Sequence, residues 1–316
     1  MAAMPEPLVD VELPLHDRRI GKVRVSYAWG REQRLFVTTD RLSAFDRIIA
    51  GVPWKGQVLN QLASWWFEQT ADIVANHVVS VPDPNVTIAR TASPLPIEVV
   101  VRGHITGVTD TALWTAYERG DRVIYGHVLP HGLVKNQALP EALVTPTTKG
   151  EGGVHDMPIT CADVVEQGLV EEQLWNRVHD IALDLFARGA DIGEQAGLIL
   201  ADTKYEFGIT DDGQLLLIDE MHTPDSSRWW VADTYDERMA AGAEPESLDK
   251  ETVRRALRDA GYSGSGEPPA LSAEVWEETT ERYISAYERL VGRTFVAGTY
   301  PAGPRITDAV STLGAP

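Results

Sequence analysis

The sequence predicts an α+β fold, with strands gathered toward the start of the chain, long helices after them and one more hairpin between the helices. Apolar and polar residues alternate from Val23 to Trp29, and Gly30 and a second apolar run follow, which predicts a hairpin over residues 20–38. Apolar residues recur at helical spacing over residues 161–190. Alternation returns over residues 199–220, so strands and helices do not follow the regular order of a doubly wound sheet.

The remaining elements are predicted in the same way. Residues 40–46 are polar and are expected to form a loop, whereas residues 103–158 form a long region punctuated by glycine and proline. The last dozen residues are expected to be a loose tail. Shorter periodic segments predict helices over residues 57–74, 111–118, 248–259 and 272–291, and strands over residues 77–81, 86–91 and 96–102.

The composition is that of a globular protein, with 43% hydrophobic and 24% charged residues. No apolar run approaches the roughly 18 residues of a membrane span. The first seven residues lack the features of a signal peptide, so we expect a cytoplasmic protein. The single cysteine, Cys161, excludes an internal disulfide and any multi-cysteine metal site, and we interpret it as structural.

The net charge of −19 argues against a nucleic-acid or an anionic-membrane partner, because both require a basic surface. It also means that an anionic substrate must be bound by local arginines and lysines against the overall field. Cationic residues within segments rich in glycine, serine and threonine are therefore candidate binding groups.

The hairpin over residues 199–220 gathers opposite charges on one face. Asp202, Lys204 and Glu206 are two residues apart and so share a face of the first strand, and an Asp-Asp-Gly turn leads to the second strand. With a loop of two or four residues, Lys204 lies opposite Asp219; with a loop of three residues, Glu220 takes that face instead. Two carboxylates on neighbouring strands can converge on one Mg²⁺ ion, which prefers oxygen ligands. The adjacent lysine could hold a phosphate or carboxylate group.

The alternative is a solvated amphipathic hairpin whose charges merely pair across its surface, since such pairs are common and weakly stabilising. The second strand, Leu215–Ile218, is apolar on both faces and is therefore expected to be buried. Acids at the end of a buried strand carry a desolvation cost and need a metal or a base as partner. This favours a functional site.

Four other segments combine glycine, hydroxyl and cationic residues that suit anions. Gly21–Arg24 opens the first hairpin, where backbone amides and a cation could hold phosphate oxygens, although an exposed basic strand would show the same residues. A second apolar strand runs into Arg102, and His104 beside it is interpreted as a packed histidine. Residues 145–156 contain a lysine, three threonines and three glycines, and residues 223–228 end in two serines and an arginine. Together they predict a nucleotide and a phosphorylated substrate.

These segments resemble the SAICAR synthetase family, the phosphoribosylaminoimidazole-succinocarboxamide synthases of purine biosynthesis. The resemblance covers roughly residues 15–295 and implies an N-terminal β-rich ATP lobe, residues 1–98, followed by an ATP-grasp-like second domain with C-terminal helices, residues 99–316. The matching motifs are Gly21–Arg24, Asp40–Asp46, Lys55–Gly56, Val100–Gly107, Thr145–Lys149, His155–Asp156, Leu200–Gly208, Ile218–Arg228 and Leu248–Lys250.

The resemblance also implies a reaction, the condensation of 5-amino-1-(5-phosphoribosyl)imidazole-4-carboxylate (CAIR) with L-aspartate, driven by ATP and Mg²⁺ through an acyl phosphate. It assigns Glu206 and Asp219 to the metal. It further assigns catalysis to Lys204, Asp202 and Lys149, ATP contacts to Gly21, Lys22, Val23, Arg24 and Lys55, and substrate contacts to Arg102, Thr106, Ser43, Asp46, Ser227, Arg228 and Lys250.

Two departures from the family pattern leave the acceptor open. His104 stands where a tyrosine is usual, and Met157 stands where many members carry glutamate; both are expected to border the substrate pocket. A specialised paralogue that acts on a different azole nucleotide carboxylate, as in nucleoside-antibiotic assembly, is therefore the alternative. A binding protein or kinase-like phosphotransferase without ligase chemistry is a third possibility, which retention of the charged site residues opposes. The expected partners are small molecules, and a homo-oligomer is left open.

Overall fold

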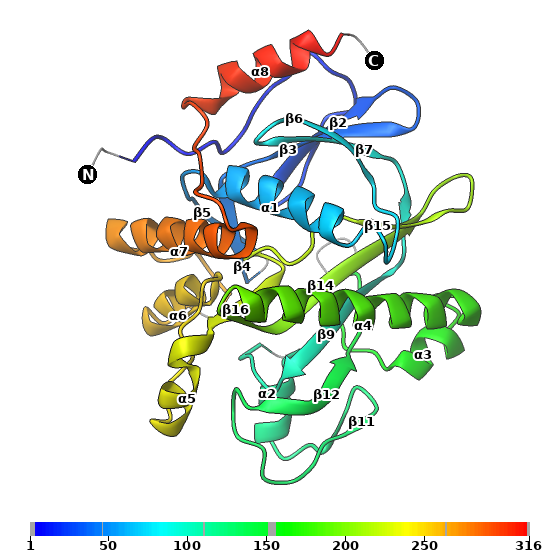
Figure 1. The fold of residues 1–316 in the computed structure, drawn as a ribbon, viewed down its shortest axis with the longest axis vertical. Helices are drawn as coiled ribbons and strands as arrows, with labels where there is room; N and C mark the ends of the chain where they lie inside the picture. The colour runs from blue at the N-terminus through cyan, green and yellow to red at the C-terminus, as the bar shows by residue number, and fades with distance from the viewer. Residues whose placement is uncertain (1–3, 46, 110, 151–155, 263, 315–316) are drawn as a thin grey trace.

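The computed structural model describes residues 4–45, 47–109, 111–150, 156–262 and 264–314, and its architecture is the predicted α+β one (Figure 1). Two sheets make up most of it, and every pairing between their strands is antiparallel within the described residues. The first sheet has the strand order β1-β2-β3-β7-β6. Its strands are β1 (Arg19–Ile20), β2 (Arg24–Trp29), β3 (Gln33–Thr38), β6 (Val78–Asp83) and β7 (Val86–Arg90).

Strands β2 and β3 form the hairpin predicted over residues 20–38. Val25 lies opposite Val37, and Tyr27 lies opposite Leu35. All four side chains are fully buried, so the alternation of apolar residues correctly predicted which face of the hairpin is buried. Gly30 supplies the turn with a φ of 66°, a conformation that glycine adopts without steric cost.

The second sheet has the core order β12-β9-β14-β15, with β13 added to β9 and with β16 and β8 added to β14. Its strands are β8 (Ser93–Pro94), β9 (Ile97–His104), β12 (Ala138–Val144), β13 (Thr147–Thr148), β14 (Leu198–Ile209), β15 (Leu215–Ile218) and β16 (Ser227–Val231). The two-stranded ribbons are β4 (Arg41–Ala44) with β5 (Arg47–Gly51), and β10 (Val123–Ile124) with β11 (His127–Val128).

Helices cover the sheets and bring distant segments together (Figure 1). Helix α4 packs against β14 and β9 with Val178 and Leu185 in the main core, and α1 contacts β3 and β6 while Leu62 and Trp66 enter the same core. The helices are α1 (Lys55–Gln69), α2 (Leu113–Glu118), α3 (Cys161–Glu166), α4 (Glu172–Gln195), α5 (Ala232–Ala240), α6 (Glu251–Asp259), α7 (Ala273–Val291) and α8 (Ala302–Thr312).

Three predicted elements were wrong in part. The loop expected over residues 40–46 is instead β4, paired with β5, and Asp46 itself lies outside the described residues. The helix expected over residues 57–74 begins at Lys55 and ends at Gln69. The single helical stretch expected over residues 161–190 is two helices, because Gly168 adopts a φ of 69° between them.

The loose tail expected at the C-terminus was also wrong. Residues 302–312 form α8, whose Ala302, Ile306 and Val310 are buried in the core of the first sheet. Helix α8 therefore packs on the first sheet, and Figure 1 shows it above the first strands. The division of the chain at residue 98 stays a prediction.

The charged hairpin has a different register from the one expected with an even loop. Residues 210–214 separate β14 from β15, and Glu206 lies opposite Ile218. This odd loop corresponds to the alternative in which Glu220, not Asp219, continues opposite Lys204. Strand β15 ends at Ile218, however, and Asp219 adopts a φ of 68°, which interrupts the alternation of side chains.

No helix in the described part of the chain is both long and apolar enough to cross a membrane.

Candidate active site

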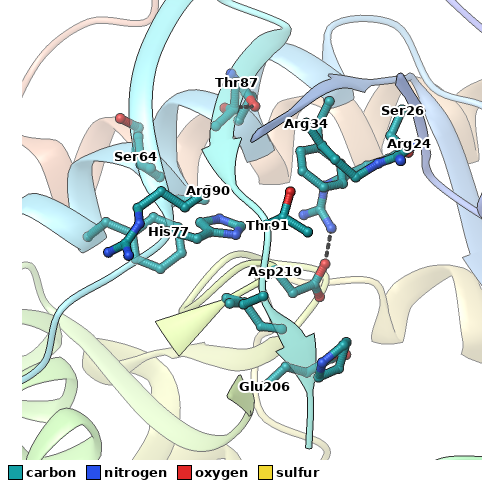
Figure 2. A pocket seen from close by; sticks show the side chains of 18 of the residues that line it. Arg24, Ser26, Arg34, Ser64, His77, Thr87, Arg90, Thr91, Glu206 and Asp219 are labelled. Atoms are coloured by element: carbon teal, nitrogen blue, oxygen red, sulfur yellow. Dashed lines mark hydrogen bonds and ion pairs between the residues drawn. The ribbon is translucent and has the colours of Figure 1, made fainter. Parts of the chain in front are cut away.

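Three adjoining cavities form a cleft that passes from the first sheet to the second. The first, of about 360 Å³, lies between the first sheet and α1 and is bordered by apolar side chains that include Phe36, Phe67 and Ile218. Among the lining residues in Figure 2, Glu206 lies at the bottom of the view and Thr87 at the top, with Asp219 and His77 between them.

The second cavity, of about 650 Å³, shares Glu206 and Asp219 with the first. The third, of about 230 Å³, is polar and adjoins the second. The residues that line both the second and the third are Glu98, Asp156, Lys204, Asp225, Ser226 and Lys250. The cleft thus runs from an apolar end through a charged centre to a polar end.

Strand β14 carries the charged centre. The Lys204 ammonium group donates to Glu98 Oε1 and Glu206 Oε1, each at 2.6 Å, and Lys149 Nζ donates to Glu206 Oε2. Burial alone would lower the pKa of Lys204, but the carboxylates of Glu206 and Glu98 outweigh it and raise that pKa. Burial alone would raise the pKa of Glu206, but Lys204 and Lys149 lower it to about 2. Both groups therefore stay charged at neutral pH.

The end of β15 carries a second ion pair. Arg24, from β2 of the first sheet, donates to Asp219 Oδ1, and its other terminal nitrogen lies 3.5 Å from Glu220 Oε1 (Figure 2 shows the Arg24–Asp219 contact). The two sheets are therefore linked by charge across the cleft. Asp219 reaches Arg24 because its left-handed backbone turns the chain away from the strand direction.

Asp202 lies between two arginines on neighbouring strands. It is the direct cross-strand partner of Arg102 on β9 and of Arg228 on β16. Arg228 Nη1 donates to Asp202 Oδ2, and Arg102 Nη1 lies 3.6 Å from the same oxygen. Thr145 Oγ1 accepts a 2.8 Å hydrogen bond from Arg102 Nε. All three charged residues line the third cavity, so two guanidinium groups are held side by side where an anion could bind.

A buried acid and lysine complete the polar wall. Asp225 Oδ2 accepts a 2.8 Å hydrogen bond from Lys55 Nζ. Lys250 lines both the second and the third cavities, and burial lowers its pKa to about 8. Arg254 lies one helical turn beyond Lys250 and also lines the third cavity.

Most of the predicted site residues are brought together. Those that line the second or third cavity are Gly21, Lys22, Val23, Arg24, Ser43, Arg102, Asp202, Lys204, Glu206, Asp219, Ser227, Arg228 and Lys250. Lys149 reaches the site through Glu206, whereas Lys55 is buried behind Asp225. Thr106 donates to Asn136 Oδ1 at 2.7 Å and borders a small recess on the other side of Arg228. The predicted substrate contact of Asp46 concerns a residue outside the described part of the chain.

Sequence reasoning missed the first cavity and Arg254. The cavity is built from β2, β3, β6, β7 and α1, so its lining residues are scattered through the sequence. Arg254 had a local signal, because a residue four positions after Lys250 on a predicted helix lies on the same face.

The acids of the cleft provide a limited set of metal ligands. Within the described residues, no three His, Cys, Asp or Glu side chains gather as a complete metal site. Glu206 and Asp219 offer carboxylate oxygens as metal ligands where the first and second cavities meet. Such a pair suits a hard cation that takes its other ligands from water or phosphate.

Comparisons with known proteins agree with this architecture. The SAICAR synthetase family model matches residues 18–269. The chain is 47% identical over 285 residues to an Agrobacterium fabrum protein described as a putative phosphoribosylaminoimidazole-succinocarboxamide synthase 2, with 90% of each chain covered. It is 46% identical over 302 residues to the Legionella pneumophila phosphoribosylaminoimidazole-succinocarboxamide synthase, with 95% of this chain and 96% of the relative covered. It also resembles the solved SAICAR synthase of Saccharomyces cerevisiae complexed with SAICAR, at 31% identity and a TM-score of 0.78, with 92% of this chain and 100% of the other covered.

Proposed function

The chain belongs to the SAICAR synthetase family, and we propose from this premise that it is a phosphoribosylaminoimidazole-succinocarboxamide synthase, an ADP-forming carbon–nitrogen ligase of purine biosynthesis. It condenses CAIR with L-aspartate to give the succinocarboxamide product, SAICAR. The observation that carries the proposal is the order of the cleft: an apolar cavity, a charged centre that includes Glu206 and Asp219, and a wall of paired arginines. The reaction needs a nucleoside triphosphate at one end of the cleft and a phosphorylated acid at the other.

The apolar first cavity suits the base of ATP, and the charged second cavity suits the phosphates. Glu206 and Asp219 lie where the two cavities meet, so we assign them to Mg²⁺. The ion would neutralise phosphate charge and orient the triphosphate. Lys204 and Arg24, which face these acids, are cations that can contact phosphate oxygens.

The third cavity suits the phosphate and carboxylate of the imidazole nucleotide. Arg102 and Arg228 present two planar guanidinium groups, which match the oxygens of a phosphate monoester. Asp202 holds both arginines and so fixes their spacing. Ser227 and Lys250 add a hydroxyl group and an ammonium group to the same wall.

The chemistry has two balanced steps. A carboxylate oxygen of CAIR attacks the γ-phosphorus of ATP, the bond from that phosphorus to the bridging oxygen breaks, and ADP leaves. The aspartate nitrogen then attacks the acyl carbon, the carbon–oxygen bond to phosphate breaks, and the nitrogen loses a proton. Phosphoryl transfer depends mainly on positioning and charge stabilisation. Because Glu206 and Glu98 raise the pKa of Lys204, we assign its ammonium group to stabilising the negative charge of the phosphoryl group.

The alternative of a specialised paralogue is not favoured. The Legionella relative carries the purine-pathway name and matches almost the whole chain. The proposed location remains the cytoplasm, because a chain with a single cysteine fits a reducing compartment.

Purified protein supplied with ATP, Mg²⁺, L-aspartate and CAIR tests the proposal. ADP and SAICAR should accumulate together over many turnovers, and omission of any one component should stop this sustained turnover. Little turnover with CAIR, combined with rapid turnover of another azole nucleotide acid, would replace the purine reaction with the paralogue's.

A further inference from the structure

Helix α7 supports the active site from outside the part of the chain that the family model matches. The match ends at residue 269, and α7 begins at Ala273. The helix packs against α1 and α6. Two adjacent residues on it, Arg282 and Tyr283, each contact a different segment of the cleft wall.

Tyr283 fixes the segment that precedes Arg228. Its hydroxyl group donates to Asp225 Oδ1 at 2.5 Å, while Lys55 Nζ donates to Asp225 Oδ2 at 2.8 Å. The Tyr283 side chain is fully buried, and burial together with the charge of Asp225 raises its pKa, so the hydroxyl stays a donor. Burial would raise the pKa of Asp225, but Lys55 and Lys250 lower it to about 2. The Asp225 carboxylate is therefore charged and held from both sides.

Arg282 fixes the segment that carries Lys250. Its Nη1 donates to the backbone carbonyl of Ser247. The Ser247 hydroxyl donates to Asp249 Oδ2 at 2.6 Å, and the Glu251 amide donates to Asp249 Oδ1 at 2.7 Å. These hydrogen bonds connect Arg282 with Ser247 and then with Asp249 and Glu251, the residues directly before and after Lys250.

We propose that Tyr283 and Arg282 are positioning residues for the imidazole-nucleotide site. They hold from behind the two segments, 223–228 and 247–250, that together form one wall of the third cavity. The inference rests on the proposed function, and it names residues that touch neither substrate. Small displacements of such a wall have large effects on a reaction that depends on placement. The effect should fall mainly on the imidazole nucleotide, because no residue of either segment lines the first cavity and only Asp225, Ser226 and Lys250 also line the second.

The test compares Tyr283→Phe with the wild type and with Tyr287→Phe. Tyr287 lies one turn further along α7, packs against Phe295, and makes no side-chain hydrogen bond to the described residues through its hydroxyl. Tyr283→Phe should weaken SAICAR binding and raise the KM for CAIR about tenfold, because hydrogen bonds to charged groups are strong ones. ADP binding, also measured by calorimetry, should weaken much less, because the first cavity contains no residue of these segments. Tyr287→Phe should change neither affinity.

A second variant keeps the inference testable if Tyr283→Phe does not fold. Arg282→Gln changes a partly exposed side chain and removes the contact with Ser247, and Glu278→Gln controls for the loss of the Arg282–Glu278 ion pair. Arg282→Gln should also weaken SAICAR binding selectively, whereas Glu278→Gln should not. Equal losses of SAICAR and ADP affinity would refute the positioning role. So would SAICAR affinities within about twofold of wild type in both Tyr283→Phe and Arg282→Gln. A wild-type protein that forms no SAICAR would refute the proposed function instead.

Discussion

Glu206 Oε1 accepts a 2.6 Å hydrogen bond from Lys204 Nζ, although both side chains stand on the same strand only two residues apart. The second oxygen of Glu206 accepts from Lys149, so one carboxylate separates two ammonium groups. This arrangement keeps positive charge in the centre of the cleft without direct repulsion between the lysines. It also makes Glu206 the most connected acid of the proposed metal site.

Glu206→Gln should therefore abolish most of the activity. An amide lacks the charge needed to bind Mg²⁺ and to balance Lys204 and Lys149. We expect kcat to fall by at least about a hundredfold, the upper effect seen when even an outer-shell metal partner is lost. The circular dichroism spectrum should be retained. Asp212→Asn, at an exposed acid in the turn of the same hairpin, is the control and should have near-normal kcat. Near-normal turnover of Glu206→Gln would remove this residue from the metal site.

Arg228→Lys should affect the imidazole nucleotide and not ATP. Lysine keeps the positive charge but lacks the planar fork that now contacts Asp202 and faces the third cavity. Steady-state kinetics should show a KM for CAIR raised about tenfold, with the KM for ATP unchanged. Arg188→Lys is the matched control, because Arg188 makes a bidentate pair with Asp72 on a different part of the surface. An unchanged KM for CAIR would exclude Arg228 from the phosphate site.

Local patterns in the sequence predicted the strands that carry the site, but not the way in which they meet. Alternation placed Asp202, Lys204 and Glu206 on one face of β14. It could not show that Arg102 and Arg228 lie on either side of Asp202, because that contact depends on pairing among three strands far apart in the chain. The alternation of side chains also breaks down at Asp219. Its left-handed backbone means that the strand pattern no longer predicts where its side chain points.

Tertiary packing explains the missed C-terminal helix. Residues 302–312 contain a glycine and a proline near their start and few large apolar side chains, so helix propensity alone is weak. The helix is stabilised by burial of Ile306 and Val310 against the first sheet, with Arg305 contacting Asp83 and Asn85. Contacts of this kind cannot be read from a short window of sequence.

Ile306→Ala should destabilise the protein through the first sheet. The side chain is fully buried, so its truncation leaves a cavity in the core that α8 shares with the first sheet. Urea denaturation should show a free energy of unfolding reduced by about 2–5 kcal/mol. Leu313→Ala, at a side chain that is 42% exposed, should change it by no more than about 0.5 kcal/mol. Equal effects of the two substitutions would show that α8 is not part of this core.

The proposed contact of Lys250 with the nucleotide acid should depend on pH. Burial lowers the pKa of Lys250 to about 8, so its ammonium form predominates below that pH and is lost as the pH rises through it. If the charged form binds an anionic group, the KM for CAIR should rise between pH 7 and pH 9. The KM for ATP should rise less, because Lys250 lines the second and third cavities and not the first.

Lys250→Arg separates this effect from other groups that titrate in the same range. The guanidinium group stays charged throughout, so the rise in the KM for CAIR above pH 8 should disappear even if the longer side chain raises the KM at every pH. Lys250→Met should show a high KM with no dependence on pH in this range, because it has no charge to lose. A wild-type KM that stays constant from pH 7 to pH 9, or a rise that persists in Lys250→Arg, would show that the Lys250 charge does not bind the substrate.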